Sequence, residues 1–294
     1  MQDRFGSALV RQTALVVLAI TAFLLQTNAA SAATLELNRT IRTSPFTGTS
    51  VSMRDNEGSA FVPSDNSLWL ADDNKNRIYE VNPVTGAVRR TIAQSAFNDA
   101  PGLDGGPPAG TERTNDFESI AYDRTHDVLY VFSGKCCISS ILPTAFRLTR
   151  QSGQFQVESY QPLPTGADYT GAAWSPTDGK IYVGKGRLMR SFDYASGTEG
   201  ASFRVAGVSG ITGMDFPPAS PDLFITVNSE RLIRIDWATR TVVSGWTFDL
   251  TPFGILDSRA VAKIGDQFFV SDGFDSRPSG DPLSHAVFVL DVTG

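Results

Sequence analysis

The chain has 294 residues and a formal net charge of −6, a length that suits one large β domain or two small ones. This mild acidity excludes the clustered basic face that nucleic-acid-binding proteins usually carry, so we expect no nucleic-acid partner. Cation binding is compatible with such a charge.

The first residues have the pattern of a secretory signal peptide. Two arginines supply a positively charged start, Thr13 to Leu25 is apolar, and Ala30-Ser31-Ala32 offers the small residues that a signal peptidase reads. The apolar run is shorter than the ~20 residues that span a bilayer, which disfavours a membrane anchor. We therefore predict a signal peptide over residues 1–32 and a single secreted, extracellular domain over residues 33–294, with no membrane span.

After this segment one pattern recurs five times. In each copy two short runs of aromatic and β-branched residues flank a turn, which predicts a β-hairpin. The copies begin at Glu57, Glu118, Thr170, Thr212 and Asp257. A third strand follows in each copy, near residues 77–81, 145–149, 188–192, 232–235 and 287–290, and a fourth comes after another turn. Four strands in a repeat of roughly forty to sixty residues are typical of a propeller blade. The predicted fold class is therefore all-β, a five-bladed β-propeller with four-stranded blades.

The two ends of the repeat array predict how the propeller closes. The fifth copy runs out of chain after its third strand, at Val292, whereas Thr34–Thr43 alternates like a strand before the first copy. We predict that this N-terminal strand completes the last blade, which would remove an exposed sheet edge. A β-sandwich or a pair of small β domains is the alternative. No helical periodicity is found after the signal peptide.

Two irregular features interrupt the repeats. Residues 94–115 form a long insertion rich in glycine and proline, predicted to be either mobile or a functional cap. Cys136 and Cys137, the only cysteines, are adjacent, so in an oxidising compartment each has only the other as an intramolecular partner. We predict a vicinal disulfide that makes a rigid bend; a redox or ligand-contacting role and two free thiols are the alternatives.

The repeat register predicts a ring of oxygen ligands at one mouth of the central channel. The residues at the start of each inner strand are Glu57, Glu118, Thr170, Thr212 and Asp257. Carboxylates brought together raise one another's pKa unless a cation offsets them. Oxygen-only ligands suit Ca²⁺ or Mg²⁺, so we predict a Ca²⁺ site formed by these five residues. The alternative is a set of solvated residues at strand ends.

Other polar residues are expected on the same face. Lys75, Lys185 and Arg259 could attract an anion, and Asn228 follows a second strand, so these four are the predicted ligand-binding residues. No catalytic residue is assigned; the candidates are His285, Asp72 and Asp272. His126 falls in a hairpin turn on the opposite face and is expected to be a surface residue. The sequence contains no nucleophile elbow, P-loop or zinc-spaced cluster.

The first blade resembles that of a known group of propellers. Asn56-Glu57-Gly58-Ser59-Ala60, then Leu68–Asp73 and Arg77–Val81, is similar to the opening blade of secreted bacterial phytase-like and SdiA-regulated propellers, which also resemble NHL and lactonase-type propellers. The resemblance implies that an acidic residue at the Glu57 position faces a calcium-occupied channel. The chain differs from many such relatives in having five repeats where they have six, and in lacking a dense basic set for phytate.

Three functional hypotheses follow. The first is an exported binding propeller with a Ca²⁺-type ion at the channel mouth and a small molecule, extracellular protein or glycan as partner. The second is a metal-dependent hydrolase of phosphoesters or lactones. The third is a structural surface protein, which large apolar patches would support. In each case we expect a monomer.

Overall fold

The computed structural model describes residues 33–98, 116–134, 143–164, 166–218, 220–273, 281 and 283–293. The predicted signal peptide, the Cys136-Cys137 pair and most of the insertion after residue 98 lie outside the described residues. Among the residues that are described, no helix is long and apolar enough to cross a membrane. Thr34–Thr293 forms one compact unit that contains every strand.

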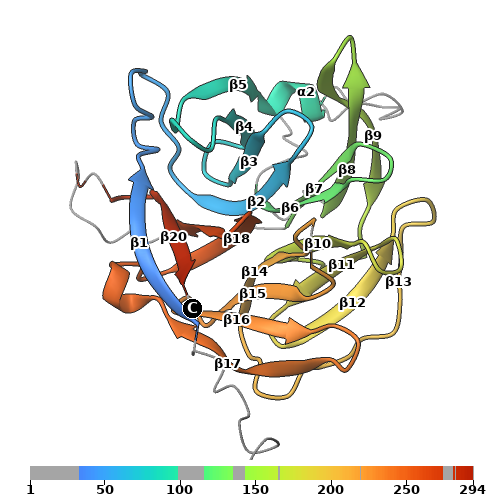
Figure 1. Cartoon of the computed structure of the whole chain (residues 1–294). Coiled ribbons are helices and arrows are strands. Elements are labelled where there is room, and N and C mark those ends of the chain that lie inside the picture. The colour runs from blue at the N-terminus through green and yellow to red at the C-terminus, as the bar shows by residue number, and fades with distance from the viewer. Residues whose placement is uncertain are drawn as a thin grey trace, which may run out of the picture. The chain divides into compact units, whose positions relative to one another are not determined.

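The strands form five antiparallel sheets of four strands each, which confirms the predicted five-bladed propeller (Figure 1). Blade one consists of β2 (Asn56–Val62), β3 (Ser67–Asp72), β4 (Arg77–Val81) and β5 (Val88–Ile92). Blade two consists of β6 (Phe117–Asp123), β7 (Val128–Ser133), β8 (Thr144–Gln151) and β9 (Gln154–Pro162). Blade three consists of β10 (Gly171–Ser175), β11 (Lys180–Lys185), β12 (Leu188–Asp193) and β13 (Thr198–Glu199). Blade four consists of β14 (Ile211–Asp215), β15 (Leu223–Val227), β16 (Arg231–Asp236) and β17 (Thr241–Asp249).

Blade five is assembled from both ends of the chain. Its strands are β18 (Ser258–Ile264), β19 (Gln267–Asp272), β20 (Val287–Thr293) and the N-terminal β1 (Thr34–Ile41), which is its outer strand. β1 pairs antiparallel with β20, from Thr34 opposite Thr293 to Ile41 opposite Val287. This confirms the predicted closure. Because β1 covers the edge of β20, that strand is not left as an open template for other chains.

The inner strands β2, β6, β10, β14 and β18 contact one another in sequence, and β18 contacts β2 to close the ring. Glycines allow these backbones to approach closely. A Cβ atom at position 58 would lie 2.6 Å from the Cα atom of Ser119, and one at position 213 would lie 2.8 Å from the Cα atom of Ala260. Two cavities of about 10 Å³ each lie between the described inner strands, and each has room for a single water molecule. A larger ligand must therefore bind at a mouth of the channel or between blades.

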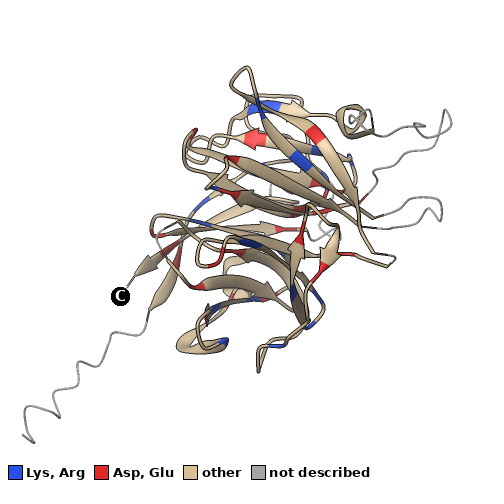
Figure 2. Ribbon diagram, turned by 90° about the vertical axis from the view of Figure 1, so that its right-hand side faces the viewer, with Lys and Arg blue, Asp and Glu red and all other residues tan. Residues whose placement is uncertain are grey.

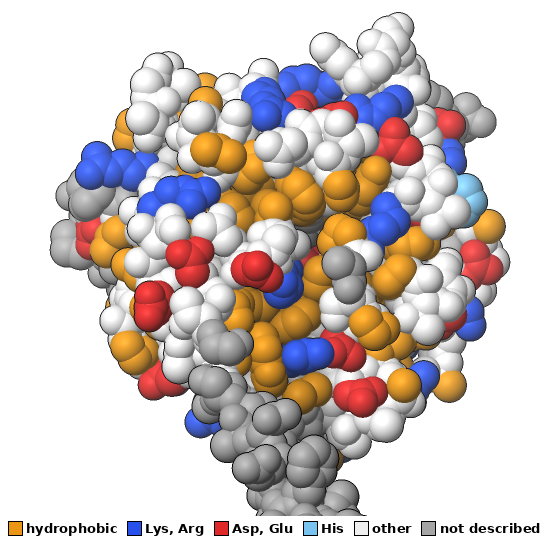
Figure 3. Space-filling model, in the orientation of Figure 1, with side chains coloured by type: hydrophobic (Ala, Val, Ile, Leu, Met, Phe, Trp, Pro, Cys, Tyr) orange, Lys and Arg blue, Asp and Glu red, His pale blue; other side chains and the backbone are white. Residues whose placement is uncertain are grey.

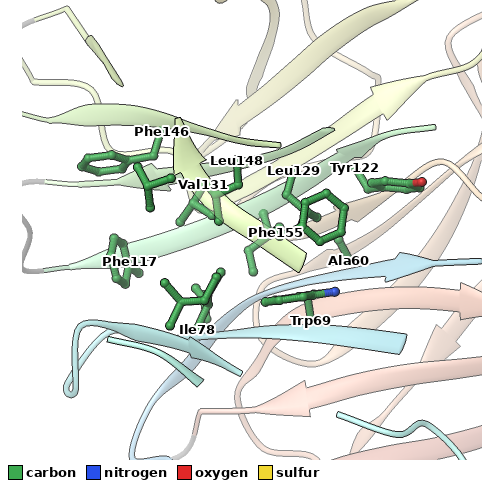
Figure 4. Close-up of a cluster of buried hydrophobic side chains, with 14 of the residues drawn as sticks. Ala60, Trp69, Ile78, Phe117, Tyr122, Leu129, Val131, Phe146, Leu148 and Phe155 are labelled. Atoms are coloured by element: carbon green, nitrogen blue, oxygen red, sulfur yellow. The ribbon is translucent and has the colours of Figure 1, made fainter. Parts of the chain in front are cut away.

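Five apolar clusters fill the spaces between neighbouring blades. One of them, which contains Tyr79 and Phe269, joins blade five to blade one. In the cluster between blades one and two, Trp69 and Phe155 make an edge-on ring contact with centroids 5.6 Å apart (Figure 4). Hydrophobic side chains are visible in the middle of the face in Figure 3, between rims that carry charged residues. The strands near the axis, such as β3, β6, β10 and β15, are buried along their whole length because a neighbouring blade covers each face.

A short helix, α2 (Gln94–Asn98), begins the long insertion, where no helix is predicted. Its buried Phe97 packs on Phe117 and Phe146, with ring centroids 4.7 and 5.2 Å apart. Five residues are too few to show a 3.6-residue periodicity, so the sequence pattern cannot reveal a helix of this length. The tertiary contacts of Phe97 hold the turn in place.

The structure corrects the repeat register in blade five. In blade one, Ala60 pairs with Trp69, whereas Phe269, at the position of Trp69, pairs with Ala262 rather than with Ala260. The cause is a shorter hairpin, because only Gly265 and Asp266 connect β18 to β19. The inner strand of blade five is therefore displaced by two residues from the predicted register.

The raised pKa of the Asp215 carboxyl group should make the free energy of unfolding depend on pH. Its carboxylate accepts a hydrogen bond from the backbone N–H of Lys263 at 2.7 Å, and burial raises its pKa to about 6. A raised pKa in the folded state means that the folded chain binds the proton more tightly, so stability falls as pH rises from about 4 to about 6 and is level above that range. Between pH 5 and pH 7.5, Asp215→Asn should remove about 1 kcal/mol of this change. Urea denaturation of both proteins at pH 5 and pH 7.5 measures it, and equal pH slopes would contradict the assignment.

Candidate functional site

Three carboxylates meet at the mouth where the inner strands begin. Ligand oxygens of Asp116, Glu118 and Asp168 all lie within 4.8 Å of one another. Asp116 directly precedes β6, Glu118 is the second residue of β6, and Asp168 lies just before β10. The pairing of β6 with β7 shifts at Glu118, which is therefore an extra residue in the inner strand. Such bulges redirect a side chain, here to the mouth.

Gly134 leaves the space that these carboxylates occupy. Its N–H donates to the carbonyl oxygen of Asp116 at 2.7 Å. A Cβ atom at position 134 would lie 2.6 Å from Oδ2 of Asp116 and 2.9 Å from Oδ1 of Asp168. Asp116 itself has φ 102°, an uncommon value for a residue with a side chain, and its N–H donates to Oδ1 of Asn76 at 2.8 Å. Strained backbone of this kind is concentrated at functional sites.

A second group of carboxylates adjoins the first. The carboxyl groups of Glu57 and Asp55 share a hydrogen bond, and those of Asp73 and Asp116 share another. Burial, followed by the charge of Asp116, raises the pKa of Asp73 to about 8. Burial also raises the pKa of Glu118 well above its usual range, with further contributions from Glu57 and Asp116. Asp73 therefore holds a proton at neutral pH unless a cation displaces it.

Arg259 occupies the fifth position of the inner ring. Its Nη1 lies 3.2 Å from Oε1 of Glu57 and its Nη2 lies 2.7 Å from Oδ2 of Asp257. The strand pairing shifts at Arg259 in blade five just as it does at Glu57 in blade one. Because of the displaced register, the positively charged Arg259 stands at the position predicted for Asp257. Asp257 stands at the position that corresponds to Asp55 in blade one. Equivalent N–H donors, from Asp73 and from Gly273, reach the carbonyl oxygens of these two aspartates at 3.0 and 2.8 Å.

Removing Arg259 should destabilise the propeller. Burial raises the pKa of Glu57, and Arg259 opposes that effect. Arg259→Ala leaves a buried carboxylate without its cation, which should cost about 2 kcal/mol, less than for a fully buried pair because the Arg259 side chain is 34% exposed. The double variant Glu57→Gln/Arg259→Ala should recover at least half of the loss. Chemical denaturation tests this; a double variant no more stable than Arg259→Ala would contradict the pairing.

The two threonines of the predicted ring hold the backbone together. Oγ1 of Thr170 donates to the carbonyl oxygen of Ile211 at 2.6 Å, and Oγ1 of Thr212 donates to Oγ1 of Thr226 at 3.1 Å. Neither is part of the cluster formed by Asp116, Glu118 and Asp168. Within the described residues the structure thus brings Glu118 of the predicted five together with two carboxylates outside the prediction.

The predicted ligand-binding residues have different surroundings. Nζ of Lys185 lies 3.3 Å from Oδ2 of Asp168 and donates to the carbonyl oxygen of Gly166 at 2.9 Å. Asn228 is exposed and exchanges hydrogen bonds with Ser209. The backbone N–H of Lys75 donates to Oδ1 of Asp72 at 3.1 Å. Arg259 is bound to carboxylates, as described above.

The catalytic candidates organise loops. Asp72 is fully buried, and its oxygens accept from the N–H groups of Arg54, Asp55 and Lys75 and from the hydroxyl of Tyr79. Asp272 is also fully buried and accepts from the N–H groups of Leu256 and Asp257. His285 is buried, with φ 55°, and its carbonyl oxygen accepts from Oγ1 of Thr43 at 2.5 Å. These contacts position the mouth loops.

The site as a whole is strongly acidic. Its carboxylates are those of Asp55, Glu57, Asp73, Asp116, Glu118, Asp168 and Asp257. Two cationic side chains, Lys185 and Arg259, face this set. Figure 2 shows acidic residues near the ends of several strands, with basic residues dispersed among them. A bound divalent cation would offset part of this repulsion.

Sequence reasoning missed Asp116 and Asp168 as ligands, although a signal for them exists. Asp55, Asp116 and Asp168 each stand two residues before Glu57, Glu118 and Thr170, and Asp257 stands two residues before Arg259. An aspartate at this spacing therefore precedes the inner strand in four of the five blades. This second repeat position, two residues before the one that was chosen, contains Asp116 and Asp168, which the structure brings together with Glu118.

Comparison with known proteins finds no matching family model and no matching curated protein. Solved structures share the fold. The glutaminyl cyclase of Myxococcus xanthus aligns with a TM-score of 0.60 at 13% identity, over 88% of this chain and 97% of that one. A gluconolactonase of Xanthomonas campestris aligns at 0.52 and 13% identity, over 82% and 87%. A PQQ-bound aldose sugar dehydrogenase of Streptomyces coelicolor aligns at 0.50 and 13%, over 89% and 98%. At these identities the likeness concerns the fold alone, which agrees with the lactonase-type propeller predicted by resemblance.

Proposed function

We propose that this protein is a cation-dependent propeller that holds a Ca²⁺-type ion between Asp116, Glu118 and Asp168 and binds a small molecule above it. The approach of these three carboxylates to within 4.8 Å is the observation that carries the proposal. Carboxylate oxygens are the preferred ligands of hard divalent cations. The excess of carboxylates over cationic side chains around them supplies the charge that such an ion would offset.

The surrounding residues fit a bound ion. Gly134 opens the space between the carboxylates, Asn76 fixes the backbone of Asp116, and Lys185 contacts Asp168. When bound, a cation of this kind polarises a carbonyl or phosphoryl oxygen of a ligand. Lys75 and Asn228 are the proposed ligand contacts around it. Arg259 and Lys185 act on the ligand indirectly, since their charged groups position carboxylates.

A second candidate function, a metal-dependent hydrolase, is favoured by Asp73. Its half-buried carboxyl group lies beside Asp116 but outside the three-carboxylate cluster, where it can exchange a proton with a bound substrate. Of the two substrate classes in the hydrolase hypothesis, the acidic mouth favours lactones over phosphoesters, because a polyanion such as phytate would be repelled. We therefore use the resemblance to phytase-like propellers to propose the fold and the bound cation, and we do not propose that the protein hydrolyses phytate.

Hydrolysis is tested on residues 33–294 with a panel of lactones, phosphate monoesters and phytate, in calcium and in EDTA. We expect calcium-dependent turnover of a lactone and loss of turnover in Asp73→Asn with calcium binding retained. We expect full activity in Asp236→Asn, whose carboxylate stands at the end of β16 in blade four and accepts from the N–H of Thr239. No metal-dependent turnover on any substrate would reject the hydrolase and leave the binding propeller to be tested by calcium affinity.

We further propose that the protein is exported by its signal peptide and acts outside the cell as a monomer, with a small molecule, protein or glycan as partner. The structural-protein hypothesis gains little support from the surface. In the part of the chain that is described, the exposed large hydrophobic residues are Leu37, Val84 and Leu256, which lie in separate segments.

A further inference from the structure

A second cavity lies between blades two and three, far from the carboxylates. Its volume is about 580 Å³, within the range of small-molecule sites. Asp123 and His126 line one side of it. Glu118 is near the start of β6 and Asp123 is its last residue, so the strand rise places the two about 17 Å apart. This cleft is therefore separate from the channel mouth.

Aromatic side chains form one wall of the cleft. Tyr130 from blade two and Tyr194 from blade three are half-buried and in contact, with ring centroids 5.2 Å apart and planes at 53°. The hydroxyl group of Tyr194 lies 3.0 Å from Oγ of Ser159, which fixes its orientation. Trp174, 6% exposed, lies behind them. The cleft thus offers rigid ring surfaces with polar tips, which cost little conformational entropy when a ligand binds.

A histidine–aspartate pair faces these rings. Oδ1 of the buried Asp123 accepts from the N–H groups of Thr125 and His126 at 2.9 and 3.1 Å, and its Oδ2 lies 2.7 Å from Nδ1 of His126. A carboxylate held in this way selects the tautomer with the proton on Nδ1, which leaves Nε2 as an acceptor. The imidazole is 71% exposed, so Nε2 is accessible to a ligand.

We propose that this cleft binds a short neutral saccharide. The C–H faces of a sugar ring pack on aromatic rings, while its hydroxyl groups donate to acceptors such as Nε2 of His126 and accept from Arg147 and Lys180, which also line the cleft. Most charges of the lining are paired with neighbouring residues, because Arg147 forms an ion pair with Glu158, Glu199 with Arg190, and Asp123 contacts His126. Polyanions and multivalent cations are disfavoured by this pairing, whereas a neutral polyhydroxylated ligand satisfies both donors and acceptors. The inference does not depend on the function proposed for the mouth.

The test is saturation-transfer NMR of residues 33–294 with maltotriose, cellotriose, xylotriose and chitotriose, followed by calorimetric titration of any that bind. Tyr194→Ala and His126→Ala should each weaken binding by about fivefold or more, the effect of losing one ring contact or one hydrogen bond. Tyr194→Phe keeps the ring and should bind almost as well as the wild type. Thr125→Ala, in the same turn and outside the lining, is the matched control and should have no effect. Glu118→Gln should also leave saccharide binding unchanged.

Two results would overturn the proposal. One is that no saccharide binds with a Kd below about 10 mM; the other is binding that persists at full strength in both His126→Ala and Tyr194→Ala. Thermal unfolding checks that each variant folds. Since His126 is exposed, its variant remains informative if Tyr194→Ala proves unstable.

Discussion

Calcium is expected to raise the Tm of residues 33–294 by about 5–10 °C when present at roughly one hundred times its Kd. The physical reason is that the folded chain alone brings Asp116, Glu118 and Asp168 within 4.8 Å, so the ion binds the folded state and not the unfolded one. Glu118→Gln and Asp168→Asn should each abolish most of this shift. The measurement is differential scanning calorimetry in calcium and in EDTA, with the metal content determined by mass spectrometry.

The control for this prediction is Asp236→Asn, which removes one carboxylate far from the mouth and should keep the full calcium shift. Gly134→Ala offers a second comparison, because its added methyl group would enter the space next to Asp116 and should reduce calcium affinity without removing a charge. Identical melting curves in calcium and in EDTA, with no metal bound to the purified protein, would reject the cation site.

Gly58→Ala is expected to cause the largest loss of stability of any single methyl addition considered. The new Cβ atom would lie 2.6 Å from the Cα atom and 2.9 Å from the carbonyl carbon of Ser119, both backbone atoms of the neighbouring inner strand. Because backbone atoms of a closed ring cannot move without displacing the other blades, we expect a loss of about 3 kcal/mol or failure to fold. Urea denaturation followed by tryptophan fluorescence measures it.

Gly171→Ala is the matched comparison. Its Cβ atom would meet the side chain of Met214, at 2.8 Å from Cγ and 3.2 Å from Sδ. A methionine side chain can change rotamer, so the loss should be about 1 kcal/mol. Equal losses for the two variants would mean that the inner ring is more compliant than its close backbone contacts indicate.

The fold was largely predictable, because repeats and periodicity are local properties of the chain. Runs of aromatic and β-branched residues, the turn residues between them and five copies of one pattern predicted the blades. The extra N-terminal strand and the incomplete fifth copy predicted closure by β1. The helix α2 was missed because its stability depends on Phe97 packing against Phe117 and Phe146, which lie in other elements.

The site was only partly predictable. Repeat register aligned Glu57 with Glu118, and in the structure both stand at the bulge of their inner strands, but it aligned Asp257 with the position that Arg259 occupies. The error arises because only two residues, Gly265 and Asp266, connect the first two strands of blade five. The repeats were aligned without a gap on their second strands, so the missing two residues shifted the inner strand of blade five. The cleft with His126 was also beyond reach, since Tyr130 and Tyr194 come from different blades and meet only after folding.

The sequence by itself thus determined the blade number, the order of the strands and the acidic character of one mouth, since each follows from a local pattern that is repeated along the chain. The tertiary structure alone decided which carboxylates meet, which of them contact Arg259 or Lys185, and that a cleft lies between blades two and three. These outcomes depend on angstrom-scale distances between strands that are remote in the chain. A local pattern carries no information about such distances until the ring has closed.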